Sequence, residues 1–100
     1  MTILELLEKV KEKNLDKYQL EDYHSQISSL YAQIMLEMAD LEKEEAMFMG
    51  KDFGEKMSVA DRKVQWKITQ RGQRLIELKR YTLACKELLN SLKSRIYSLI

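Results

Sequence analysis

The stretch LIELKRYTLACKELLNSLKSRI, residues 75–96, sets the architecture because its apolar residues recur every seven positions. With Leu75 at position a of a heptad, the repeat extends in both directions along the chain. The a positions are Ile68, Leu75, Thr82, Leu89 and Ile96, and the d positions are Val64, Arg71, Leu78, Cys85, Leu92 and Leu99. Thr82 and Arg71 are the polar exceptions. This spacing predicts one long helix that buries a narrow apolar stripe against another helix.

The preceding part of the chain supplies a partner helix. Its apolar residues also follow helical spacing, at Leu20, Tyr23, Ile27, Leu30, Ile34, Met38, Leu41 and Phe48. Between the two runs, residues 50–58 (GKDFGEKMS) contain two of the three glycines and have no apolar period, which predicts a turn. Ser58, three residues before Asp61, resembles the capping box that starts a helix.

A short amphipathic run comes first, with Ile3, Leu6 and Val10 on one side and an interruption at Asn14. The 100 residues contain no proline and are rich in strong helix formers. We therefore expect an all-α protein, one helical domain over residues 1–100, built as a long antiparallel helical hairpin resembling a coiled coil with a short N-terminal helix. The expected helices span about 2–13, 16–49 and 59–99, with a loop at 50–58.

The charges divide unevenly between the two halves. Residues 1–50 hold five lysines against eleven acids, a balance of −6, and residues 51–100 hold twelve basic residues against five acids, a balance of +7. Basic residues flank the seam of the last helix at positions e and g: Lys67, Lys79, Lys86, Lys93, Arg74 and Arg95. They would repel a parallel copy and attract the acidic helix, which favours the antiparallel hairpin.

Some apolar residues of the last helix fall outside the seam. They are Ile76, Leu83, Leu88 and Tyr97. We interpret them as a second seam that joins hairpins into a homo-oligomer, an oligomeric helical bundle.

Several functional classes lack their signatures. The sequence has no phosphate-binding loop, no catalytic triad order and no metal-ligand spacing, so we expect a protein that is not an enzyme and uses no cofactor or metal. One cysteine cannot form an internal disulfide, and the single histidine, His24, cannot form a histidine cluster. The first residues do not resemble a signal peptide, and no window is apolar enough for a membrane span, which predicts a cytoplasmic protein without membrane contact.

The segment from Asp61 to Arg80 is the main candidate for a site because it is rich in lysine and arginine and contains the single tryptophan. A helical projection groups its basic residues with that ring: Lys63, Trp66, Lys67, Arg71 and Arg74. Cations that follow phosphates and a ring that stacks on bases suit single-stranded nucleic acid. The alternative is that these cations neutralise the acidic helix and that Trp66 is a packing anchor, with Arg71 paired to Glu37, Glu44 or Glu45.

Residues 28–100 also resemble a family. The order of an acidic helix, SLYAQIMLEMADLEKEEAMF, a glycine-containing turn and MSVADRKVQWKITQRGQRLIELKRYTLACKELLNSLKSRI is similar to small phage-encoded helical proteins of recombination and replication modules. The UvsY-type recombination mediators of T-even phages are the named example. The resemblance implies a phage protein in the host cytoplasm that binds single-stranded DNA as a ring oligomer and helps to load a recombinase. It also implies that Lys63, Lys67, Arg71 and Arg74 contact the strand.

Two other functions remain open from the residues. One is a protein-binding module, such as an inhibitor of a host enzyme, a DNA mimic or an assembly chaperone, that acts through the acidic face of residues 37–45 and the exposed apolar seam. The other is a purely structural coiled-coil part of a virion or filament. The acidic helix would carry recognition in the first, whereas self-assembly would be sufficient for the second.

Overall fold

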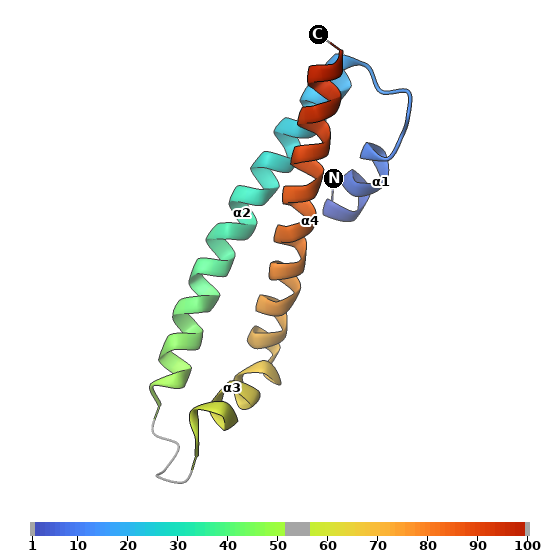
Figure 1. Ribbon diagram of the computed structural model, residues 1–100. Helices are drawn as coiled ribbons and strands as arrows, with labels where there is room; N and C mark the ends of the chain where they lie inside the picture. The colour runs from blue at the N-terminus through green and yellow to red at the C-terminus, as the bar shows by residue number, and fades with distance from the viewer. Residues whose placement is uncertain (1, 52–56, 100) are drawn as a thin grey trace.

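Two long antiparallel helices form the body of the protein. The computed structural model describes residues 2–51 and 57–99, in which the helices are α1 (Ile3–Val10), α2 (Lys17–Met49), α3 (Val59–Lys67) and α4 (Gln70–Ser98), without a strand. α2 and α4 lie side by side along a rod with extents of 62 × 21 × 18 Å (Figure 1). The all-α class is therefore confirmed, and the long pairing of α2 with α4 fits the expected hairpin.

Polar side chains and a glycine mark the ends of α2 and the start of α3. The backbone N–H of Gln19 donates to Asp16 Oδ1 at 2.8 Å, and the N–H of Asp16 donates to Gln19 Oε1 at 2.9 Å, which completes a capping box. Gly50 follows the last turn of α2. At α3, Ser58 Oγ accepts from the N–H of Asp61 at 3.1 Å, as its position predicts. Residues 52–56 of the expected loop lie outside the described residues.

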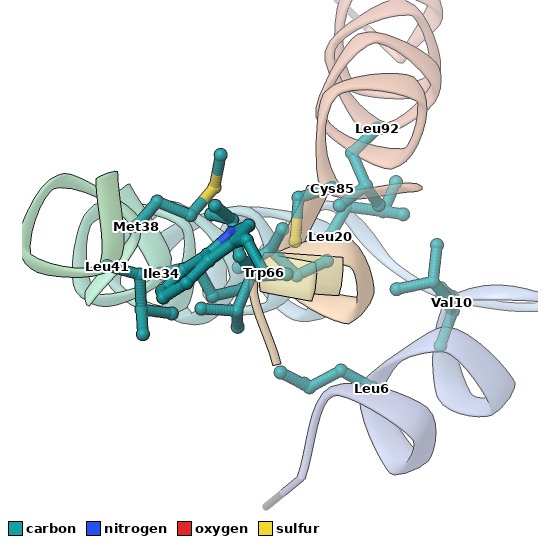
Figure 2. Packing of buried hydrophobic residues seen from close by; sticks show 13 residues of the cluster. Leu6, Val10, Leu20, Ile34, Met38, Leu41, Trp66, Cys85 and Leu92 are labelled. Atoms are coloured by element: carbon teal, nitrogen blue, oxygen red, sulfur yellow. The ribbon is translucent and has the colours of Figure 1, made fainter. Parts of the chain in front are cut away.

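The apolar seam between α2 and α4 provides most of the core (Figure 2). Its fully buried side chains include Leu20, Ile27 and Leu41 of α2 and Leu75, Leu78, Cys85 and Leu92 of α4. Thr82 is also buried, and its hydroxyl lies 2.9 Å from the Leu78 carbonyl oxygen and 3.1 Å from the Met38 sulfur. Among the described residues, no helix is both long and apolar enough to cross a membrane.

The short helix α1 packs against its own hairpin through Leu6 and Val10, and Leu15 is buried beyond it. α1 ends at Val10, three residues before the expected end. Arg95 of α4 explains how this end is held: its Nη1 donates to the Val10 carbonyl at 2.7 Å and its Nη2 to the Glu12 carbonyl at 2.9 Å. Carbonyl groups at a helix C-terminus lack partners within the helix, and the guanidinium satisfies them here.

The expected single helix over 59–99 is divided in two, which corrects the sequence prediction. Ile68 and Thr69 separate α3 from α4, and Figure 1 shows α3 set at an angle across the end of the hairpin. Thr69 acts as the N-cap of α4 because its Oγ1 accepts from the N–H of Gly72 at 3.0 Å. The bend removes the first heptad positions from the seam, so Val64 and Ile68 are 56% and 67% exposed.

Two leucines of α2 test which face of this helix is buried. Leu41 is 0% exposed and Leu36 is 70% exposed. We expect Leu41→Ala to lower the free energy of unfolding by about 2–5 kcal/mol, because the truncation leaves a cavity in the seam. Leu36→Ala, the matched control on the same helix, should change it by less than about 0.5 kcal/mol. Urea denaturation followed by circular dichroism measures both, and equal losses would contradict this assignment of faces.

Candidate nucleic-acid interface

Arg71 and Arg74, two of the predicted strand contacts, are engaged with acids of α2. Arg71 forms a two-pronged ion pair with Glu44, with Nε and Nη2 at 2.8 and 2.7 Å from the two carboxylate oxygens. Arg74 binds Glu37 in the same way at 2.9 and 3.1 Å, and its Nη1 donates to Glu77 at 2.7 Å. Paired arginines offer less positive charge to a phosphate. The ion pairs of both arginines match the alternative interpretation of the sequence, in which these cations neutralise the acidic helix.

These pairs alter the titration of the acids. Hydrogen bonds from Arg74 lower the pKa of Glu37 below its ordinary value, and the charges of Arg74 and Arg71 act in the same direction against the effect of burial. The hydrogen bonds from Arg71 likewise lower the pKa of Glu44. Each carboxylate is therefore held in its charged form.

Trp66 lies in the core rather than on the surface. Its side chain is 6% exposed, and its ring centroid is 5.6 Å from that of Phe48 at an interplanar angle of 52°. Such a tilted aromatic pair anchors α3 on the end of α2. In this conformation the indole ring is not open to a base, so Trp66 acts as the packing anchor that the sequence offered as its alternative role.

Lys63 and Lys67 are exposed on α3, and neither forms an ion pair within residues 2–51 and 57–99. The four basic residues predicted to contact the strand are thus separated into two accessible lysines and two arginines paired with acids of α2. The segment does not form one continuous cationic strip. A strand that reached this end of the molecule would meet the two lysines first.

A second set of cations was not recognised as a site from the sequence. Lys79, Lys86 and Lys93 of α4 occur every seven residues, a spacing that predicts attraction to the acidic helix. All three are exposed, and none pairs with an acid in the part of the chain that the structure describes. We call these three residues the lysine row. The seven-residue spacing of these lysines was the available sequence signal for a cationic site. The same spacing is also expected of lysines that only flank the seam.

The lysine row shares its side of α4 with apolar residues. At 3.6 residues per turn, Leu83 and Tyr97 fall within about a quarter-turn of the three lysines. Leu83 is 63% exposed and Tyr97 is 64% exposed, and Tyr97 and Lys93 line a shallow groove with Glu21, His24 and Ile96. This face combines cations with one accessible aromatic ring.

The four predicted interface residues therefore differ in accessibility. Leu83 and Tyr97 are open, whereas Ile76 and Leu88 are half-buried, and Leu88 packs against the core of its own chain. A continuous second seam on α4 is not formed by these side chains. Exposed apolar residues also occur on α2, where Tyr18, Leu36 and Met47 are 81%, 70% and 74% exposed and lie on one side of the helix.

Cys85 and His24 are the remaining candidate groups. Cys85 is buried in the seam, and desolvation raises the pKa of its thiol, which suppresses the reactive thiolate. His24 lines the shallow groove next to Lys93. Within the described residues, no three His, Cys, Asp or Glu side chains are grouped to hold a metal ion.

Comparison with models of protein families, with curated proteins and with solved structures found no match to this chain.

The Arg74–Glu37 pair gives a pH-dependent contribution to stability. A carboxylate whose pKa is lowered on folding stabilises the protein at pH values above the ordinary pKa of the group, here 4.5. This stabilisation is lost as the pH falls through the lowered pKa. We expect wild type to exceed Glu37→Gln in free energy of unfolding by about 0.5 kcal/mol at pH 7, because the pair is partly exposed. The gap should shrink below pH 4.5.

Urea unfolding at neutral and acidic pH measures this gap. Glu42→Gln is the matched control, because Glu42 is exposed and forms no ion pair with any described residue. A gap for Glu37→Gln that stays the same in acid would contradict the role assigned to the ion pair.

Proposed function

We propose that this protein is a non-enzymatic accessory protein that binds single-stranded DNA in recombination or replication, as its resemblance to phage recombination mediators implies. The observation that carries the proposal is the unpaired lysine row on α4. The internal ion pairs neutralise Arg71 and Arg74, but these three lysines keep their charge for an external anion. The proposal therefore moves the main strand contact from the Lys63–Arg74 segment to the lysine row, at the exposed edge of α4 beside its seam with α2.

The geometry of the row suits a flexible anionic chain. Side chains seven residues apart on a helix are separated by about 10 Å, so the row runs roughly 20 Å along the rod. Lysine contacts phosphates as a point charge and does not select a base. Tyr97 at one end offers an exposed ring on which a base can stack. Lys63 and Lys67 would extend the contact at the opposite end of α4.

We further propose that the protein acts as a homo-oligomer. Two lysine rows facing each other would repel, which disfavours association through Leu83 and Tyr97. The exposed apolar residues Tyr18, Leu36 and Met47 lie on α2, which lacks the lysine row, and we propose that this side of α2 forms the contact between subunits. A ring or bundle joined through α2 would leave the lysine rows free for the strand and for a recombinase that acts on it.

The lysine row can be tested by its effect on salt dependence. Replacing Lys79, Lys86 and Lys93 with Gln should weaken binding of a labelled single-stranded oligonucleotide, because three phosphate contacts are lost. The slope of log affinity against log salt should become shallower by about 2, since each contact with a single strand contributes about 0.7. Fluorescence anisotropy at several salt concentrations gives both quantities.

The matched control replaces Lys11, Lys13 and Lys17 with Gln, which changes the net charge by the same amount. These lysines lie near α1 and the start of α2, and Lys11 and Lys17 already contact Glu8 and Glu21 at 3.4 and 4.0 Å. The control should bind nearly as well as wild type. If the two triple variants weaken binding equally, the effect comes from net charge and not from the lysine row. If the wild-type protein does not bind the strand, the proposed function is excluded.

A second function is favoured by the outer face of α2. Leu36 and Met35 are exposed, and the acid Asp40 lies one turn from Leu36 on the same helix. An apolar residue beside acids suits a protein partner with a basic rim, as in a protein-binding module such as an inhibitor, a DNA mimic or an assembly chaperone.

Leu36→Glu distinguishes the two roles proposed for this face of α2, contact between subunits and contact with another protein. If α2 joins subunits, this substitution should reduce the mass measured by light scattering to that of a smaller species, because a buried charge opposes association. If α2 instead binds another protein, wild type and variant should have the same mass. The same mass in both would contradict the proposed subunit contact.

A further inference from the structure

The junction between α3 and α4 carries two competing apolar patterns. Val64 and Ile68 continue the heptad spacing of α4, yet both are more than half exposed. Trp66 lies off that spacing and is buried. The bend thus selects the tryptophan face of α3 and turns the aliphatic face to solvent. A sequence with two usable faces can pack in two ways.

A small set of contacts holds the bent arrangement. The Thr69 hydroxyl donates to the Trp66 carbonyl at 2.6 Å and accepts from the N–H of Gly72 at 3.0 Å. Gln73 Nε2 also donates to the Lys67 carbonyl. These bonds satisfy the last carbonyls of α3 and the first N–H groups of α4. In an uninterrupted helix the backbone itself would satisfy the same groups.

Gly72 makes the bend possible. A Cβ atom at this position would lie 2.0 Å from the Trp66 carbonyl oxygen, which is far inside van der Waals contact. Only glycine permits this close approach of the two backbones. Glycine would have no such role in a straight helix, where it lowers helix stability relative to alanine. Its presence at residue 72 is thus specific to the bent arrangement.

We propose that this junction is a two-state switch that hides or presents Trp66. In the second state, α3 and α4 form one continuous helix, in which Val64 and Ile68 turn toward the α2 side and Trp66 turns outward. Burial of two aliphatic side chains offsets exposure of one indole.

The second state, in which Trp66 turns outward, would bring the indole beside cations. In a continuous helix Trp66 lies one turn from Lys63, and Lys67 and Arg74 share the neighbouring side. A base stacked on the indole, with its phosphate near Lys63, binds only this state, so single-stranded DNA shifts the population toward it. This last step rests on the proposed function, whereas the two-state junction does not.

Trp66 itself reports the switch because it is the only tryptophan in the sequence. Gly72→Ala blocks the bend and favours the continuous helix. We expect its fluorescence emission to move to longer wavelength and quenching by acrylamide to rise several-fold, while circular dichroism shows equal or greater helix content. Gly50→Ala is the matched control, because a Cβ there would meet its nearest atom at an ordinary 3.5 Å and should leave the emission unchanged.

A second variant keeps the test decisive if Gly72→Ala does not fold. Thr69→Ala removes both hydroxyl contacts at the bend and should shift the emission in the same direction. Adding Val64→Ser and Ile68→Ser to Thr69→Ala should return the emission toward the wild-type wavelength, because the straight state loses its buried aliphatic side chains while Gly72 still permits the bend. Short-wavelength emission from the folded variants with Val64 and Ile68 intact would overturn the switch.

The DNA step has its own readout. Adding an unlabelled single strand to wild type should quench Trp66, and anisotropy of a labelled strand independently reports whether binding occurs. Binding without a change in Trp66 emission would overturn the coupling of the switch to DNA while leaving the proposed function intact. Absence of binding would remove the proposed function and with it this coupling, and the alanine variants would still decide whether the junction has two states.

Discussion

The arrangement of the hairpin depends on two bidentate ion pairs, in which arginines of α4 bind glutamates of α2. A heptad seam of leucine and isoleucine buries apolar area almost equally well when one helix slides by seven residues, so it does not define the alignment alone. Arg71 on Glu44 and Arg74 on Glu37 remove this degeneracy, because each planar guanidinium needs a carboxylate opposite it. Partly exposed pairs add little stability, but they favour one register over its neighbours.

Once these pairs form, the remaining charges acquire distinct positions. The acids near the end of α2 are partly neutralised by the arginines, whereas the lysines of α4 lie beyond their reach and face solvent. A nearly neutral protein can therefore present a local cationic face. The net charge of +1 conceals this separation because it averages over both halves of the chain.

Much of the fold could be predicted from the sequence because local signals agreed with one another. Asp16 and Ser58 start helices as N-caps, Gly50 ends one, and the seam positions of α4 from Leu75 to Leu92 are buried, apart from the partly buried Leu89. The break at Ile68 could not be predicted in this way, because the heptad pattern continues through it. Thr69 followed three residues later by Gly72 was the available local signal, and it is weaker than a sustained repeat.

The candidate site was harder to predict than the fold. Sequence periodicity places Arg71 and Trp66 on a helix, but only tertiary packing determines whether a cation meets an acid or a ring enters the core. The lysines of α4 had the same spacing whether they flanked a seam or faced solvent. Side-chain identity alone therefore indicated which residue types could bind a strand, and the packing of α3 and α4 against α2 determined which of them are accessible.

The bonds from Arg95 to the end of α1 also affect how the chain folds during synthesis. Arg95 and Val10 are separated by 85 positions, so α1 cannot dock in its final place until residue 95 has left the ribosome. The acidic α2 emerges long before the basic α4 that covers its apolar side. Contacts so distant in sequence slow folding, and an incomplete chain exposes its apolar residues for seconds at ordinary rates of translation. The apolar side of the nascent α2 therefore stays uncovered until the second half of the chain arrives.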